Sequence, residues 1–207
     1  MFDIQTVSYT GTGAPAAFTR SLRETGFAVL TDHPITPDRI QQAYDAWGAF
    51  FNSDAKHDFL VDPETQDGYF PFKSENAKGA KAKDLKEFYH VYPKGRVPAE
   101  IEALTRALYD DLVAIGARLL EWVQAEAPAD VLDGFSEPVP DMLSGSQQNL
   151  LRILHYPPLD EAPEPGAVRA AAHGDINLIT VLLAGSAPGL EAQDTAGNWH
   201  AVPCDRA

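Results

Sequence analysis

The sequence predicts an α+β fold in which helices pack outside a sheet or barrel of antiparallel strands. In the first half of the 207 residues, apolar side chains recur mostly at helical spacing. After residue 145 the period changes to two, and short runs of β-forming residues end at proline or glycine. Helices followed by short strands, without a regular alternation of the two, favour α+β over α/β.

Two amphipathic helices are expected near the start of the chain. The first covers residues 14–24 and stops at Gly26, which leads into a short strand over residues 27–30. The second begins after Thr36, an N-cap residue, with Pro37 at the first helical position. Its apolar stripe recurs every three or four residues and consists of Ile40, Tyr44, Trp47 and Phe51.

The clearest element is a long helix that opens at Pro98 and ends before Pro128. Its aliphatic stripe consists of Ile101, Leu104, Leu108, Leu112, Ile115, Leu119 and Val123. At the usual rise per residue this helix is roughly 40 Å long, so its stripe needs a long apolar partner such as a sheet. Before it the pattern is weaker, and aromatic segments at 68–71 and 88–92 suggest strands or loops.

Four strands are predicted in the last third of the chain. The first two cover residues 150–156 and 178–183, where β-branched and aliphatic residues are closed by Pro157 and by Gly185. The last two cover 190–193 and 199–202 and form a hairpin. Four strands are few for a closed barrel, so the edge of this sheet must be covered by another part of the structure.

Composition and charge exclude several kinds of partner. Sixteen basic against 30 acidic residues give a formal charge of −14, which repels a polyanion, so we expect no nucleic acid. The single cysteine, Cys204, permits no internal disulfide. The start of the chain has no leader pattern, and no window of about 18 apolar residues could cross a membrane. The sequence therefore predicts a soluble, cytoplasmic protein without a membrane partner.

Five of the seven lysines lie between Lys73 and Lys86. Lysines are ordinarily exposed, so this segment is expected to be a solvated loop or helix face. The alternative is an electropositive rim that draws an anionic small molecule towards a cleft. The sequence leaves both open.

His173 and Asp175 form the most suggestive pair of potential metal ligands. Residues two apart on a strand project to the same side, so the imidazole and the carboxylate could bind one cation. With a second imidazole such a pair makes the facial triad of non-haem Fe(II) oxygenases. His-x-Asp also occurs by chance, and the alternative is a loop histidine capped by a nearby aspartate.

Motifs along the whole chain point to one family. A helix runs into a Gly-Phe strand that ends near His33, Asp84 opens a D-x-K-E stretch, and Tyr156 closes an L-R-x-x-x-Y-P-P strand. In chain order the matching segments are 21–33, 47–51 with Lys56, 84–88, 151–158, 172–180, 188–190 and 197–203. Together they resemble the isopenicillin N synthase-like family of 2-oxoglutarate- and Fe(II)-dependent oxygenases, particularly its bacterial members.

This resemblance implies a double-stranded β-helix, or jelly roll, with Fe(II) at one mouth, 2-oxoglutarate as co-substrate and O2 as oxidant. His173 and Asp175 would be metal ligands. Tyr156 would help to bind the carboxylate of 2-oxoglutarate or of the substrate; its alternative role is that of a core residue with a satisfied hydroxyl. Leu154 replaces an asparagine of the family, and His33 and His57 match no ligand position.

The resemblance also divides the chain into three regions. Residues 1–97 are an N-terminal dioxygenase-type region, residues 98–145 a supporting helical region, and residues 146–207 the first part of the jelly roll. In the family a second histidine ligand and an Arg-x-Ser that binds 2-oxoglutarate follow the His-x-Asp pair. His200 falls at a variable position, so we expect this chain to lack both features and its jelly roll to be incomplete.

Three hypotheses about function follow. The first is an oxygenase that hydroxylates or desaturates a small-molecule substrate, or a related oxidase that does not need 2-oxoglutarate. The second is a catalytically inactive binding or scaffold domain of the same fold. In the third, a partner chain supplies missing strands and a histidine by β-augmentation. A monomer or a weak homo-oligomer is expected in the first two.

Overall fold

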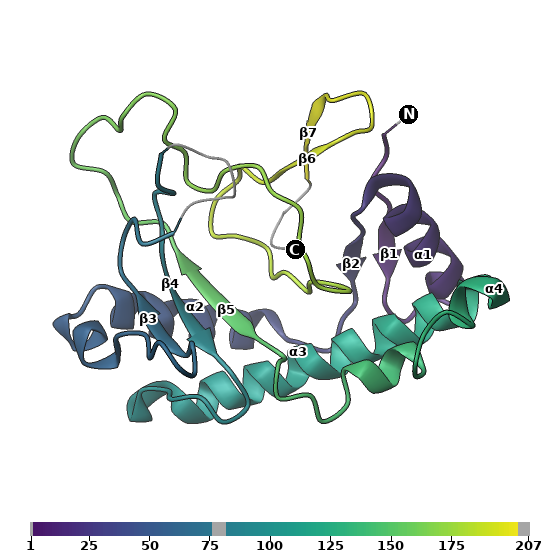
Figure 1. Ribbon diagram of the computed structural model, residues 1–207, viewed down its shortest axis with the longest axis horizontal. Coiled ribbons are helices and arrows are strands. Elements are labelled where there is room, and N and C mark those ends of the chain that lie inside the picture. The colour runs from purple at the N-terminus through teal and green to yellow at the C-terminus, as the bar shows by residue number, and fades with distance from the viewer. Residues whose placement is uncertain (1, 76–81, 203–207) are drawn as a thin grey trace. The chain divides into compact units, whose positions relative to one another are not determined.

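The computed structural model describes residues 2–75 and 82–202, and Figure 1 shows their path. The chain divides into two compact units that interleave in sequence. The first unit comprises Met1–Ile40, Asp110–Gly145 and Thr180–Ala207, and the second comprises Gln41–Tyr109 and Ser146–Ile179. Each unit takes residues from all three predicted regions, whose boundaries remain a prediction.

The first unit begins with two parallel strands joined by a helix. Strand β1 (Thr6–Ser8) pairs with β2 (Val29–Thr31), and α1 (Ala14–Thr25) connects them. The helix ends as predicted at Gly26, whose φ of 77° is left-handed and whose amide donates to the carbonyl of Leu22. The sequence predicted α1 and β2, but it indicated neither β1 nor a parallel pair.

The rest of the first unit consists of short elements and a hairpin. Helix α4 (Ala129–Leu132) and the 3-10 helix η2 (Val139–Met142) are single turns. Strands β6 (Glu191–Gln193) and β7 (Trp199–Ala201) form the predicted antiparallel hairpin. At its turn the carboxylate of Asp194 accepts hydrogen bonds from the backbone amides of residues 196 and 198.

Two long helices have residues in both units and match the prediction closely. Helix α2 (Pro37–Phe51) starts at the predicted proline, and α3 (Ala99–Glu126) is the 28-residue helix drawn in teal in Figure 1. In the second unit the indole of Trp47 on α2 donates to the hydroxyl of Thr105 on α3 at 3.1 Å. This buried hydrogen bond satisfies both polar groups where the two helices meet.

An antiparallel sheet in the order β3-β4-β5 forms the centre of the second unit (Figure 1). Its strands are β3 (Gly68–Phe70), β4 (Glu87–Val91) and β5 (Leu151–His155), and the 3-10 helix η1 (Asp54–Phe59) precedes them. Each of the aromatic segments at 68–71 and 88–92 therefore contains most or all of a strand.

One face of this sheet is covered by aromatic side chains of α2. The buried cluster on this face consists of Trp47, Phe50, Phe51, Tyr69, Tyr89, Val91 and Val97. Tyr89 is completely buried, and its hydroxyl donates to the carbonyl of Arg96 at 2.9 Å. Because side chains alternate along a strand, Lys86, Phe88 and His90 of β4 lie on the opposite face and are buried there. We call this the open face because its β5 side chains, Arg152, Leu154 and the following Tyr156, are more than a third exposed.

Two predictions for the end of the second unit and the segment after it are wrong. Residues 178–183 form no strand, and the side chains of Leu178 and Leu182 are exposed, at 50% and 60%. His173 and Asp175 also lie in irregular backbone, not on a strand. Since both segments pair with no described strand, their backbone groups lack the ladder that a strand requires.

The described residues therefore form a mixed helix and sheet structure with sheets of two, three and two strands. A closed jelly roll remains a prediction. Among residues 2–75 and 82–202, no helix has the length and apolar character needed to cross a membrane.

Candidate metal and co-substrate site

His173 and Asp175 lie side by side although they are not on a strand. The Nε2 atom of His173 is 3.5 Å from the Oδ1 atom of Asp175, and both side chains are half exposed. Ligand atoms lie about 2.1 Å from a divalent first-row metal, so two of them can be up to about 4.2 Å apart. The distance between these two atoms is therefore compatible with binding one cation.

A backbone contact selects the ring nitrogen of His173 that can bind a metal. The Nδ1 atom is 2.8 Å from the carbonyl oxygen of Ala171, which can only accept, so Nδ1 carries the proton. Nε2 then keeps its lone pair and is the atom beside Asp175. Histidine ligands of metals commonly donate their second ring nitrogen to a carbonyl in this way.

The segment before His173 is tied to the beginning of β4. The amide of Ala171 donates to the carboxylate of Asp84 at 3.1 Å, and the amide of Leu85 donates to the carbonyl of Val168 at 2.9 Å. Asp84 is the first residue of the D-x-K-E stretch. These hydrogen bonds hold the backbone that leads into the His-x-Asp pair against the residues just before β4.

Tyr156 follows the last residue of β5 and is the predicted co-substrate contact. The residue is 40% exposed, and its hydroxyl makes no hydrogen bond to another residue of the described ranges. Desolvation raises the pKa of Tyr156, and the cation of Lys86 opposes this shift. The hydroxyl is thus a neutral group that can donate to a carboxylate.

Lys86 lies across the strand ladder from Tyr156 and was not predicted as a site residue. Its ammonium is 2.8 Å from Asp84 and 3.1 Å from Glu75, and its side chain is only 7% exposed. Burial alone would lower the pKa of Lys86, but hydrogen bonds to these two carboxylates outweigh it and raise the pKa. The signal in the sequence was the D-x-K-E stretch.

The other described lysines of segment 73–86, Lys73 and Lys83, are exposed as expected for a solvated loop. Lys78 and Lys81 lie outside the described residues. The alternative of an electropositive rim stays a prediction, to which the buried Lys86 does not contribute because its carboxylate partners neutralise it.

His90 and Arg152 form a second polar pair that the sequence did not reveal. They are directly opposite on β4 and β5, and Nε of Arg152 donates to Nε2 of His90 at 2.9 Å. The other ring nitrogen of His90 is 3.1 Å from the carbonyl of Gln66, so it carries the proton. Arg152 lies in the motif segment 151–158 and His90 in the aromatic segment 88–92, but their pairing depends on strand register.

A buried carboxylate holds the opposite face of the sheet together. Glu87 accepts hydrogen bonds from Lys56 at 3.0 Å, from the hydroxyl of Tyr69 and from the ring of His155 at 2.7 Å. Its side chain is 4% exposed, and burial raises its pKa less than these three donors lower it. The ring of His155 stacks on Phe51. This network fixes β5 immediately before Tyr156.

Within residues 2–75 and 82–202, no group of three or more His, Cys, Asp or Glu side chains is arranged to hold a metal. Two histidines that match no ligand position of the family have other contacts. His200 is bound to Asp194 of its own hairpin at 2.8 Å, and His57 contacts the edge of the Tyr69 ring.

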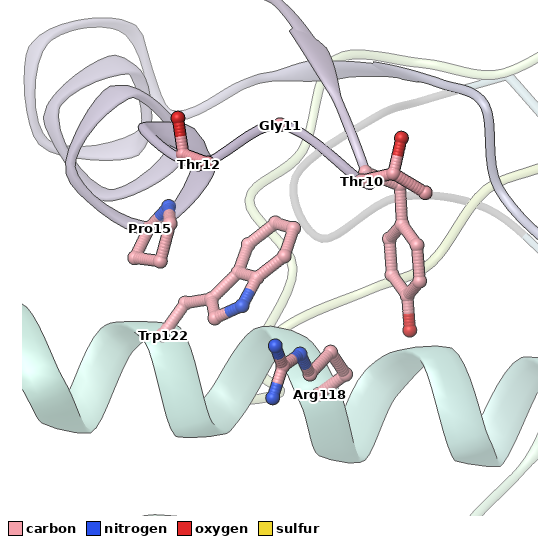
Figure 2. A pocket seen from close by; sticks show the side chains of 7 residues that line it. Thr10, Gly11, Thr12, Pro15, Arg118 and Trp122 are labelled. Carbon is pink, nitrogen blue, oxygen red and sulfur yellow. The ribbon is translucent and has the colours of Figure 1, made fainter.

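A cavity of about 420 Å³ lies in the first unit and contains none of the predicted site residues. Figure 2 shows Trp122 and Arg118 projecting from α3 towards the loop that carries Gly11. The rings of Tyr9 and Phe18 pack against Trp122 at 5.5 and 5.6 Å. We interpret it as a gap beside the aromatic core of this unit.

Two solved structures resemble the chain over nearly its whole length. A protein from Shewanella oneidensis described as an oxygenase is 45% identical, with a TM-score of 0.87 over 98% of this chain and 72% of its own. A protein from Caulobacter crescentus assigned to the 2OG-Fe(II) oxygenase family is 33% identical, with a TM-score of 0.70 over 99% and 70%.

Sequence comparisons agree with these structures. Residues 13–108 match the family model described as "non-haem dioxygenase in morphine synthesis N-terminal". A 2-oxoglutarate-dependent dioxygenase of Monascus ruber is 27% identical over 86% of this chain. The chain spans 61% of the length of that relative.

Proposed function

Since this chain belongs to the 2OG-Fe(II) oxygenase family, we propose that it provides the metal pair and a co-substrate contact of an oxygenase that oxidises a small molecule. The reaction would be a hydroxylation or a desaturation that consumes 2-oxoglutarate and O2. In the complete protein the strands would belong to a jelly roll.

The observation that carries this proposal is the juxtaposition of His173 and Asp175. Their facing atoms are 3.5 Å apart, and the contact to Ala171 leaves the lone pair of Nε2 available. An imidazole and a carboxylate are two of the three ligands that non-haem Fe(II) oxygenases use. The residues present therefore fit an Fe(II) ion, although they do not complete its coordination.

The other residues of the site have roles in binding and orientation. When bound, Fe(II) supplies the redox chemistry by which O2 and 2-oxoglutarate oxidise a C–H bond. Tyr156 would donate its hydroxyl to a carboxylate of 2-oxoglutarate or of the substrate. Asp84 would hold the segment of His173 through the amide of Ala171, and Lys86 would keep Asp84 in place.

The third metal ligand and the Arg-x-Ser are proposed to lie outside these 207 residues. The alternative is a catalytically inactive binding domain of the same fold, since two ligands alone hold a metal weakly. A second copy of the fold could also supply the missing strands.

The test is turnover by the full-length protein that carries this chain. We expect Fe(II)-dependent formation of succinate from 2-oxoglutarate with uptake of O2. His173→Ala and Asp175→Ala should each lower this rate by at least about 100-fold. The exposed His57→Ala serves as the matched control and should retain the wild-type rate.

Two results would contradict the proposal. Wild-type activity in folded His173→Ala would remove His173 from the site. A folded wild-type protein that binds metal but consumes neither 2-oxoglutarate nor O2 would favour the inactive binding domain.

The partners and location also remain proposals. The charge of −14 supports a small-molecule substrate over nucleic acid, and a monomer or weak homo-oligomer is proposed. The single cysteine is compatible with the reducing cytoplasm.

A further inference from the structure

The open face of the sheet presents three rows of side chains between β4 and β5. Lys86 and Tyr156 lie just beyond one end of the ladder, where Glu87 pairs with His155. Phe88 and Leu154 are opposite each other in the middle row. His90 and Arg152 form the far row. A polar row thus lies on each side of an apolar one.

Arg152 in the far row is held rigidly but remains accessible. Its guanidinium lies 4.7 Å from the centre of the Phe88 ring, Nε donates to His90, and Nη1 is 3.4 Å from Glu75. Its side chain is still 36% exposed. Among the described residues, Nη2 has no hydrogen-bond partner. A preorganised guanidinium with an open donor is suited to a carboxylate.

The middle row offers an apolar surface of fixed shape. The rings of Phe70 and Phe88 stack with centroids 4.4 Å apart and an interplanar angle of 14°. Phe88 is buried, whereas Leu154 is 38% exposed. Leu154 is therefore the apolar side chain that the middle row offers to a ligand.

The near row adjoins the metal pair. Asp84, which binds Lys86, also binds the amide of Ala171, two residues before His173. Tyr156, directly after β5, is four positions from Arg152, which corresponds to about 13 Å of extended chain. A ligand that reaches both rows must therefore be elongated.

We propose that the open face binds the substrate and selects an elongated carboxylic acid with an apolar middle. Its carboxylate pairs with Arg152, its apolar part lies over the exposed Leu154, and its reacting end lies towards Tyr156 and His173. Lys86 is not the anchor, because Asp84 and Glu75 already neutralise it. This assignment deepens the proposed oxygenase function and rests on it.

The probes are 3-phenylpropionate, 5-phenylpentanoate and 8-phenyloctanoate, each compared with its primary amide. Their binding to the full-length protein with Mn(II) and 2-oxoglutarate is measured by calorimetry. We expect the longer acids to bind at least about tenfold more tightly than their amides, because a charge-assisted pair to Arg152 is lost in the amide. The shortest acid should bind more weakly than the longer acids, since it cannot span the rows.

Two variants test the role of Arg152, and a third serves as the control. Arg152→Gln should remove the preference for acid over amide while leaving amide binding unchanged. Leu154→Asp keeps Arg152 and places a negative charge on the middle row, so it should weaken acids more than amides. Arg39→Gln, which alters a comparably exposed arginine paired with Asp111, should keep the full preference. Thermal melting confirms that each variant is folded.

The outcomes separate this inference from the proposed function. Equal binding of acids and amides by the wild type, or an unchanged preference in folded Arg152→Gln or in folded Leu154→Asp, would overturn the inference while Mn(II) binding still supports the oxygenase. A wild type that fails to bind Mn(II) but keeps an Arg152-dependent preference would instead overturn the oxygenase function and leave the carboxylate site.

Discussion

His90 is a buried histidine that the protein keeps neutral. Burial lowers the pKa of His90 to about 4, and the neighbouring cation of Arg152 acts in the same direction. The carbonyl of Gln66 fixes its tautomer, so the unprotonated nitrogen can accept from Arg152. A protonated ring would lose this hydrogen bond and face a like charge.

This histidine should make the stability of the protein depend on pH. The unfolded chain binds a proton near pH 6.5, whereas the folded chain resists it down to about 4, so stability is lost as the pH falls through this window. We expect a loss of about 2 kcal/mol between pH 7 and pH 5 from His90. Urea unfolding of wild type and His90→Gln measures it.

His90→Gln should lack the loss of stability between pH 7 and pH 5 that comes from His90. The control His57→Gln, at an exposed position, should retain this loss. Identical pH profiles for the wild type and His90→Gln would show that His90 is not the group responsible.

At the scale of elements, the sequence predicted those whose signals are local. Helices α1, α2 and α3 begin or end near proline and glycine, and the β6–β7 hairpin has its turn residues between two strands. Strand β1 is three residues long and gains its partner only through the parallel pairing with β2. Residues 178–183 have the pattern of a strand, but apolar alternation does not provide the neighbour that a strand needs.

Four elements, η1, β3, β4 and β5, are joined by the carboxylate of Glu87. We expect Glu87→Gln to lower the free energy of unfolding by about 3 kcal/mol, because it leaves the ammonium of Lys56 without its buried partner. Chemical denaturation measures the change. Glu121→Gln is the control, since Glu121 forms an exposed pair with Arg118 and should cost less than about 1 kcal/mol.

Equal effects of the two substitutions would show that the Glu87 network does not stabilise the sheet. A large effect of Glu87→Gln would instead explain why β5 presents Tyr156 in a fixed position, since His155 is one of the three donors.

At the scale of the whole molecule, motifs in the sequence proposed the site residues, whereas only the structure shows where these residues lie. His173, Asp175 and Tyr156 followed from motifs, and the structure places the first two in contact, but in irregular backbone. The open face could not be predicted, because the pairing of Arg152 with His90 depends on a register set by two strands about 60 residues apart in the chain. Motifs identify chemistry, whereas register and loop contacts decide the shape of the site.

The central claim, that His173 and Asp175 together bind a divalent metal, is tested most directly by Mn(II) titration of the full-length protein, followed by electron paramagnetic resonance. The account predicts saturable binding in the wild type and in His57→Ala, and affinity lower by at least about tenfold in both His173→Ala and Asp175→Asn. Unchanged Mn(II) affinity in either folded ligand variant would contradict it.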